Sequence, residues 1–269
     1  MESLFSDLHY WLVDHPSISQ YEWKHGHTFG SSPLFVAVTV TVYLSTAIFL
    51  HRSALLPPLS SSWLRRISVV HNITLCLLSL AMAVGCSLAV LHQMPNRDWS
   101  WVVCFPANQT PPRGPAFFWA HVAYFSKILE FVDTLLILLS GSRARRLTFL
   151  HLYHHAVVVV TSYLGIMTSQ TLLPVGVVVN ATVHVVMYGY YLLCALGYRP
   201  RWKRVVTECQ IVQFVLGFMV SGLMLFYHFT GSGCSGMWSW VFHALFGAVL
   251  LAQFMEFHFT NYRSKARKD

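Results

Sequence analysis

Apolar residues fall in long blocks along this chain, and polar or proline-containing segments separate the blocks. A bilayer core about 30 Å thick needs roughly 20 predominantly apolar residues for one helical crossing. Seven blocks satisfy this requirement. They cover residues 33–50, 67–92, 116–139, 148–168, 174–196, 205–228 and 237–260. The pattern predicts an all-α integral membrane protein with seven transmembrane helices, in which residues 1–269 form a single transmembrane domain.

The composition agrees with this fold class. Hydrophobic residues make up 55% of the 269 positions and charged residues only 10%, whereas soluble domains carry about 25% charged residues. The first 32 residues contain four acidic side chains and no continuous apolar stretch. They therefore do not resemble a cleaved signal peptide.

Basic residues indicate the orientation of the chain in the membrane. Fourteen of the 18 Lys and Arg residues follow the first, third, fifth and seventh spans, whereas Lys24, Arg97 and Arg113 lie on the opposite side. Because basic loops remain in the cytosol, we expect a cytosolic C-terminus and a lumenal N-terminus. Basic residues of this kind also bind phosphate groups, although topology alone accounts for these.

Two cysteines fall in loops that this topology places on the lumenal side, Cys104 and Cys234. An oxidising lumen permits disulfides, so we predict a bond between them, with two free thiols as the alternative. The sequon at Asn108 lies on the same side, although Pro111 follows it directly.

Four consecutive spans carry polar side chains at helical spacing. Such residues are costly inside a membrane and are usually functional, and steps of three and four residues place them on one helix face. With the predicted topology they all lie near the cytosolic leaflet, which suits a substrate with a charged head and an apolar tail. In chain order they are Lys127, Glu130, Asp133 and Thr134; His151, His154 and His155; Asn180, His184, Met187, Tyr188 and Tyr191; and Thr207, Gln210 and Gln213.

Purely structural explanations exist for several of these residues. Lys127 and Glu130 can form a buried ion pair that only fixes packing, and His184 and the glutamines can join helices by hydrogen bonds. Three histidines on one intramembrane face are harder to explain without metal binding, proton transfer or nucleophilic attack.

The four stripes resemble the motifs of the ELO family of very-long-chain fatty acid elongases, in the family's order. Residues 127–134 are similar to KxxExxDT, residues 151–155 to HxxHH, residues 184–191 to HxxMYxYY and residues 207–213 to TxxQxxQ. The resemblance implies an endoplasmic-reticulum enzyme that condenses a long acyl-CoA with malonyl-CoA to a 3-oxoacyl-CoA, CO2 and CoA. It also implies seven helices, six of which enclose a narrow acyl-chain tunnel, and no metal or further cofactor.

The resemblance also suggests roles for individual residues. His154 would take the acyl group, since a neutral imidazole can act as a nucleophile near pH 7, and His184 would assist malonyl decarboxylation. His151 and His155 would orient the site. The expected substrate-binding shell comprises Lys127, Glu130, Asp133, Asn180, Tyr188, Tyr191, Gln210 and Gln213. Expected partners are the reductases and dehydratase of the elongation cycle, with homo-oligomers possible and no nucleic acid.

Two other functions fit parts of the pattern. Membrane di-iron desaturases and hydroxylases share HxxHH, but they use about eight histidines in three clusters to ligate two irons, and HxxHH occurs once here. A seven-helix transporter or receptor would explain the spans, although transporters often contain internal repeats. The C-terminal Lys265 to Asp269 resembles a dilysine retrieval signal imperfectly, because Arg267 replaces a lysine.

Overall fold

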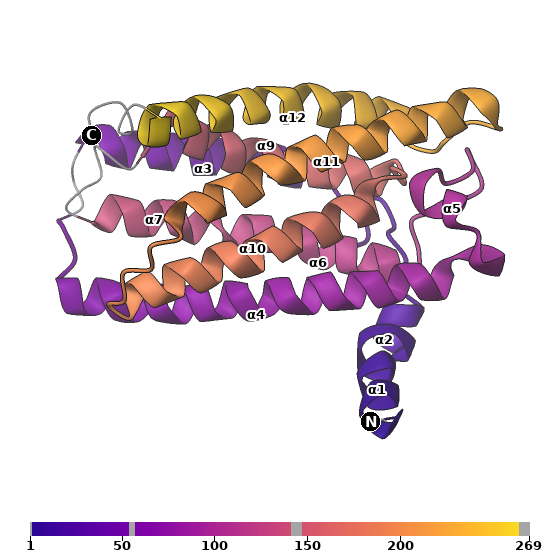
Figure 1. Ribbon diagram of the computed structural model, residues 1–269, viewed down its shortest axis with the longest axis horizontal. Coiled ribbons are helices and arrows are strands. Elements are labelled where there is room, and N and C mark those ends of the chain that lie inside the picture. The colour runs from indigo at the N-terminus through magenta and orange to yellow at the C-terminus, as the bar shows by residue number, and fades with distance from the viewer. Residues whose placement is uncertain (1, 54–56, 141–146, 264–269) are drawn as a thin grey trace.

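The computed structural model describes residues 2–53, 57–140 and 147–263, and in this part of the chain it contains helices but no strands. Short helices form the N-terminal segment and the connection after the second span, and longer ones form the bundle (Figure 1). They are α1 (Glu2–His9), η1 (Tyr10–Asp14), α2 (Pro16–Ser19), α3 (Pro33–Ser53), α4 (Ser61–Gln93), η2 (Pro95–Arg97), α5 (Trp99–Val103), α6 (Pro115–Leu129), α7 (Phe131–Leu139), α9 (Phe149–Met167), α10 (Leu173–Ala195), α11 (Lys203–Thr230), α12 (Met237–His258) and η3 (Phe259–Arg263).

Six helices in this part of the chain are long and apolar enough to cross a membrane, namely α3, α4, α9, α10, α11 and α12. They confirm six of the predicted spans and the multi-pass membrane fold. The largest difference at a helix end is at the start of α4, which begins at Ser61 instead of residue 67.

The remaining predicted span, residues 116–139, is divided into α6 and α7, which follow one another along the bundle (Figure 1). The expectation of one continuous helix is therefore wrong in detail. At the junction the Asp133 amide donates to the Glu130 carbonyl at 3.0 Å, a three-residue spacing that tightens the turn. Neither α6 nor α7 alone reaches the length of a crossing helix, so the count of seven crossings stays a prediction.

The bundle packs around α4, α6, α9 and α10. Their facing sides bury large side chains such as Phe117, Tyr124, Val159 and Ile166. Helices α11 and α12 lie at the outside, where apolar side chains such as Trp238 are exposed. Apolar surface on this scale requires a partner of similar polarity, and for a crossing helix that partner is lipid.

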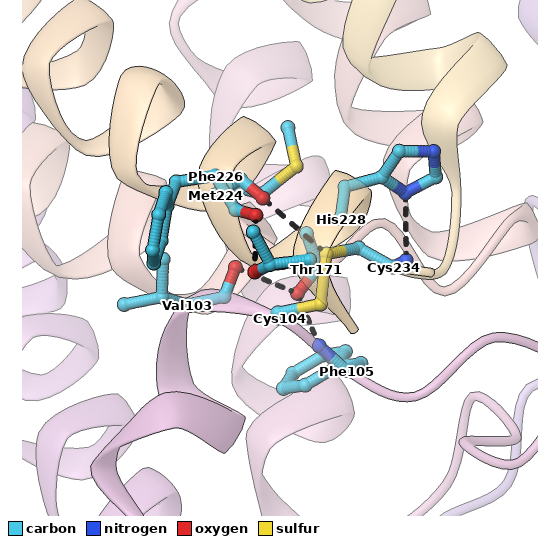
Figure 2. The surroundings of a disulfide bond; sticks show 9 residues. Val103, Cys104, Phe105, Thr171, Met224, Phe226, His228 and Cys234 are labelled. Carbon is cyan, nitrogen blue, oxygen red and sulfur yellow. Dashed lines mark hydrogen bonds between the residues drawn. A yellow bond between two sulfur atoms is a disulfide. The ribbon is translucent and has the colours of Figure 1, made fainter. Parts of the chain in front are cut away.

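A disulfide between Cys104 and Cys234, the pair that the sequence predicts, joins the connections after α5 and α11 at one end of the bundle, and Thr171 attaches the connection after α9 to them (Figure 2). The Phe105 amide donates to Thr171 Oγ1 at 2.5 Å, and Thr171 Oγ1 donates to the Val103 carbonyl at 3.1 Å. The connections after α5, α9 and α11 therefore meet here. We call this the disulfide end.

The segment before α3 reaches the same end. The Trp23 amide donates to the Pro112 carbonyl at 2.9 Å and the Gly114 amide to the Tyr21 carbonyl at 2.8 Å. In the predicted topology, consecutive helices alternate in direction, so these loops must all lie at the same end of the bundle. The structure agrees. Which end faces the lumen stays a prediction, and Arg143, Arg145, Arg146 and residues 264–269, which include the dilysine-like sequence, lie outside the described residues.

Candidate active site

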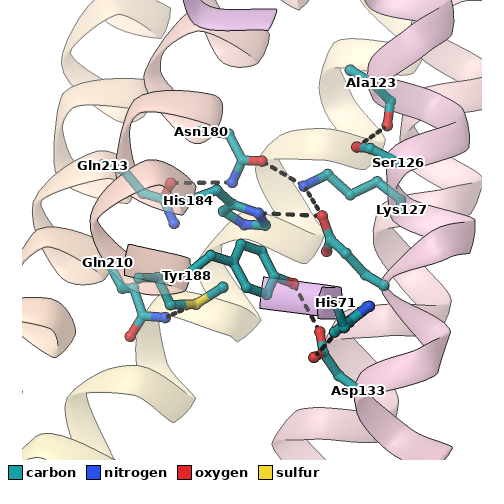
Figure 3. Close-up of polar contacts among 12 residues, drawn as sticks. His71, Ala123, Ser126, Lys127, Asp133, Asn180, His184, Tyr188, Gln210 and Gln213 are labelled. Atoms are coloured by element: carbon teal, nitrogen blue, oxygen red, sulfur yellow. Dashed lines mark hydrogen bonds and ion pairs between the residues drawn. The ribbon is translucent and has the colours of Figure 1, made fainter. Parts of the chain in front are cut away.

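A chain of buried and partly buried polar contacts, centred on Lys127 and Asn180, joins α6, α10 and α11 (Figure 3). Lys127 Nζ donates to Glu130 Oε1 at 2.9 Å and to Asn180 Oδ1 at 2.7 Å. Asn180 Nδ2 in turn donates to Gln213 Oε1 at 3.2 Å. His184 Nδ1 lies 3.2 Å from the same oxygen of Glu130, an ion-pair distance that lacks hydrogen-bond geometry. Five residues from three of the predicted polar stripes therefore form one network.

A second carboxylate network lies beside the first. Tyr188 OH donates to Asp133 Oδ2 at 2.7 Å, and His71 Nε2 lies 3.0 Å from Asp133 Oδ1. The rings of His184 and Tyr188 are 5.5 Å apart, so the two networks are in contact through α10.

The tight turn at Glu130 explains why both carboxylates face α10. Residues three apart are eclipsed in such a turn, which aligns Glu130 with Asp133. Their partners His184 and Tyr188 are four residues apart on α10 and share a face of that helix. Two consecutive turns of α10 thus meet two carboxylates of the third span, as Figure 3 shows.

The HxxHH residues occupy the first two turns of α9, in the half of the bundle away from the disulfide end. His151 Nε2 lies 2.8 Å from Thr134 Oγ1, which is 2.9 Å from Tyr43 OH. The His155 ring lies 4.3 Å from that of His151 and 5.6 Å from that of His154. The His155 ring also lies 6.5 Å from the ring of Phe131, the residue that follows Glu130.

His154 and His155 each hold a buried Nδ1 atom that has no hydrogen-bond partner among the described residues. Leaving a polar atom buried and unpaired costs about 1–3 kcal/mol. Because native proteins pair nearly all buried polar groups, these two nitrogens are candidates for contact with a bound substrate.

The charge distribution of the centre follows from these contacts. Lys127 is 7% exposed, Glu130 2% and His184 5%. Charges this deeply buried are stable only when they are paired. The Glu130 carboxylate is neutralised by Lys127. The Asp133 carboxylate is held by the His71 imidazole and the Tyr188 phenol. The result is a dry polar centre that can stabilise charge developing on a bound substrate.

Two predicted residues lie at the edge of the centre. Gln210 Nε2 contacts Met187 Sδ at 3.3 Å, and Tyr191 is 41% exposed, with its ring 6.1 Å from that of Tyr188. Two contacting residues, His71 and Tyr43, were missed by the sequence analysis. His71 had a usable signal, since it is an ionisable residue inside a predicted span.

The expected acyl tunnel stays a prediction. Two open hollows of about 380 and 450 Å³ lie on the side of the bundle formed by α4 and α6. His71 lines the larger one, whereas His154 and His184 line neither.

The fold and this centre define a multi-pass helical membrane protein with a buried cluster of histidines and carboxylates. The chain belongs to the ELO family, described as the GNS1/SUR4 family, whose profile matches residues 28–269. It is similar to fatty acid elongase A of Dictyostelium discoideum, with 29% identity over 256 residues that cover 93% of this chain and 91% of the relative.

Other relatives carry related names. Fatty acid elongase 3-like of Arabidopsis thaliana is 26% identical over 270 residues, which cover 95% of this chain and 92% of that protein. Fatty acid elongase sre1 of Dictyostelium discoideum is 33% identical over 204 residues, covering 74% and 72% respectively. No solved structure gives a significant match.

Proposed function

We propose that this protein is the condensing enzyme of fatty acid elongation, which joins a long-chain acyl-CoA to malonyl-CoA. The observation that carries the proposal is the convergence of Lys127, Glu130, Asn180 and His184 beside the HxxHH histidines, which the same span contacts where Thr134 meets His151 at 2.8 Å. Family membership and the names of the relatives, fatty acid elongases, support the same reaction class.

The reaction has two half-steps. A ring nitrogen of His154 attacks the thioester carbonyl carbon, forms an N-acyl bond and expels CoA thiolate, which accepts the proton lost by the imidazole. Malonyl-CoA then releases CO2, and the electron pair left on its C2 carbon gives an enolate. This carbon attacks the acyl carbonyl, and the bond to His154 breaks with its electron pair going to the ring nitrogen. The imidazole regains a proton from water, and a 3-oxoacyl-CoA two carbons longer leaves.

The surrounding residues serve these steps. His184, held against Glu130, stabilises the enolate as it forms, because a fixed positive dipole or charge in a dry site strongly favours developing negative charge. His151 and His155 orient His154. The dry centre also protects the acyl-imidazole from hydrolysis. The polar shell comprises Lys127, Glu130, Asp133, Asn180, Tyr188, Tyr191, Gln210 and Gln213.

A condensation assay tests the proposal. Purified protein in detergent receives labelled malonyl-CoA and acyl-CoAs of graded length, without reductant. We expect a labelled 3-oxoacyl-CoA from the wild type and from His27→Ala, a control in an exposed histidine. His154→Ala should form no product while melting close to the wild-type temperature. Wild-type turnover retained in His154→Ala excludes this residue as the acyl acceptor.

A second experiment addresses the intermediate and the di-iron alternative. Protein incubated with acyl-CoA alone should release one equivalent of CoA and gain the acyl mass on the peptide that contains His154. Acyl mass on a different residue contradicts the assignment. Stoichiometric iron in active protein, or desaturated product, supports a desaturase or hydroxylase instead.

The location follows from the proposed function. We place the protein in the endoplasmic-reticulum membrane with a cytosolic C-terminus, alongside the reductases and dehydratase that complete the cycle. In sealed microsomes, protease should remove a C-terminal epitope without permeabilisation. Protection of that epitope reverses the orientation.

A further inference from the structure

We propose that His9, Asp14 and His92 form a zinc-binding site at the disulfide end of the bundle. One nitrogen from each histidine and a carboxylate oxygen all lie within 4.8 Å of one another. Among residues 2–53, 57–140 and 147–263, this is the one group of three such side chains with that spacing. The site is separate from the proposed catalytic centre.

The N-terminal segment is shaped to bring two of the ligands together. Residues Tyr10–Asp14 form a π-helical turn, in which the His15 amide donates to the Tyr10 carbonyl five residues earlier at 2.8 Å. An α-helix aligns residues three or four apart, whereas this wider turn aligns residues five apart. His9 Nδ1 consequently lies 2.7 Å from Asp14 Oδ2. Single π turns occur frequently at functional sites.

Packing fixes this turn against the bundle. Val13 is fully buried, and Trp119 Nε1 of α6 donates to the Leu12 carbonyl at 2.9 Å. The third ligand comes from the last turn of α4, where the His92 ring lies 5.6 Å from that of His9. Two segments far apart in sequence therefore present a prearranged ligand set.

One pair of the three side chains is joined by a hydrogen bond, between His9 Nδ1 and Asp14 Oδ2 at 2.7 Å. His92 Nδ1 lies 4.0 Å from Asp14 Oδ1, which is beyond hydrogen-bond reach. Tetrahedral zinc with bonds of about 2.0–2.2 Å places neighbouring ligand atoms roughly 3.3 Å apart. The separations of 2.7 Å from His9 Nδ1 to Asp14 Oδ2 and 4.0 Å from His92 Nδ1 to Asp14 Oδ1 lie on either side of this value. Because they involve different carboxylate oxygens, rotation of the side chains toward one shared oxygen completes the site.

The ligand set suits zinc in chemistry as well as geometry. Two imidazoles and one carboxylate are a common zinc triad that leaves a fourth position open. The side chains of His9, Asp14 and His92 are 26%, 43% and 47% exposed, so solvent reaches that position. His9 and Asp14 precede the family-matched residues 28–269. The site is thus a feature of this chain beyond its proposed elongase function.

Zinc binding is tested on the full-length protein, purified without a histidine tag and stripped with a chelator. Bound zinc is measured by mass spectrometry after equilibrium dialysis, and the melting temperature is recorded with and without zinc. We expect about one zinc per chain and a melting temperature raised by zinc. His92→Ala and Asp14→Asn should weaken binding at least tenfold and abolish the rise. His27→Ala, an exposed histidine outside the group, should behave as wild type.

Cobalt provides an independent readout, because a tetrahedral cobalt site absorbs visible light whereas hydrated cobalt does so weakly. That absorption should appear in the wild type and be lost in His92→Ala. Absence of zinc binding at micromolar concentration in the wild type overturns the proposal. So does binding that is equally tight in His92→Ala and Asp14→Asn, since the metal then sits elsewhere. Neither readout depends on condensation activity.

Discussion

The buried ion pair between Lys127 and Glu130 gives the sharpest prediction of stability. Replacing Glu130 by Gln keeps the shape of the side chain but removes the charge that Lys127 faces at 2.9 Å. The ammonium would remain buried with Asn180 Oδ1, at 2.7 Å, as its principal partner. Breaking a buried pair in this way costs about 3–5 kcal/mol. With roughly 2–4 °C per kcal/mol for large domains, we expect Glu130→Gln to melt about 6–20 °C below wild type.

The reverse substitution should cost less. Lys127→Met leaves Glu130 beside His184 Nδ1 at 3.2 Å, so the carboxylate keeps one close polar partner. The double variant Lys127→Met with Glu130→Gln removes both charges, a change that is often nearly neutral. Its loss of stability should therefore be smaller than the sum of the two single losses.

Thermal unfolding in detergent measures these shifts, with Glu22→Gln as a matched control. Glu22 pairs with Lys24 at 3.0 Å but on an exposed surface. Such pairs contribute about 0–1 kcal/mol, so the control should melt close to wild type. A shift in Glu130→Gln no larger than in Glu22→Gln refutes the reasoning. Strict additivity in the double variant refutes it as well.

Three further predictions follow from other contacts. His71→Ala removes a partner of the second carboxylate, so kcat in the condensation assay should fall about 10- to 100-fold through lost positioning; unchanged kcat contradicts this role. Cys104→Ser removes a disulfide that spans 130 residues, so the free energy of unfolding should fall by about 2–5 kcal/mol. Wild-type protein treated with reductant should melt at the same lowered temperature. Gly85→Ala places a Cβ in collision with the Trp119 ring, so the free energy of unfolding should fall by about 1–3 kcal/mol. The control Gly176→Ala meets no atom within 4 Å and should melt at or slightly above the wild-type temperature.

Hydrophobic block length was enough to predict the crossing helices, because each must supply a continuous apolar stretch to match the bilayer. The start of α4 was less predictable. Residues 61–66 include Arg65 and Arg66, which ended the apolar block in the sequence. In the structure Arg65 Nε donates to the carbonyl of Ala195, the last residue of α10, at 2.7 Å. Helix α4 therefore continues through an arginine that hydrogen-bonds the C-terminal end of α10.

The residues of the candidate site were largely predictable, but their pairing was not. Spacing along one helix shows that Glu130 and Asp133 share a face, yet it contains no information about which neighbour each meets. His71 and Tyr43 were missed for a related reason. Neither belongs to one of the four polar stripes of the sequence, and only contact with Asp133 and Thr134 connects each of them to the centre.

The turn at Glu130 shows most clearly why local sequence was insufficient. The residues around it include no proline or glycine, so helix propensity predicts an unbroken helix through the third span. Partners outside that span hold the tightened turn: His184 on α10 contacts Glu130, while His71 on α4 and Tyr188 on α10 hold Asp133. Because these partners come from two other helices, the shape of the third span is a property of the assembled bundle. The alignment of the two carboxylates is therefore a consequence of the same contacts that make the centre polar and dry.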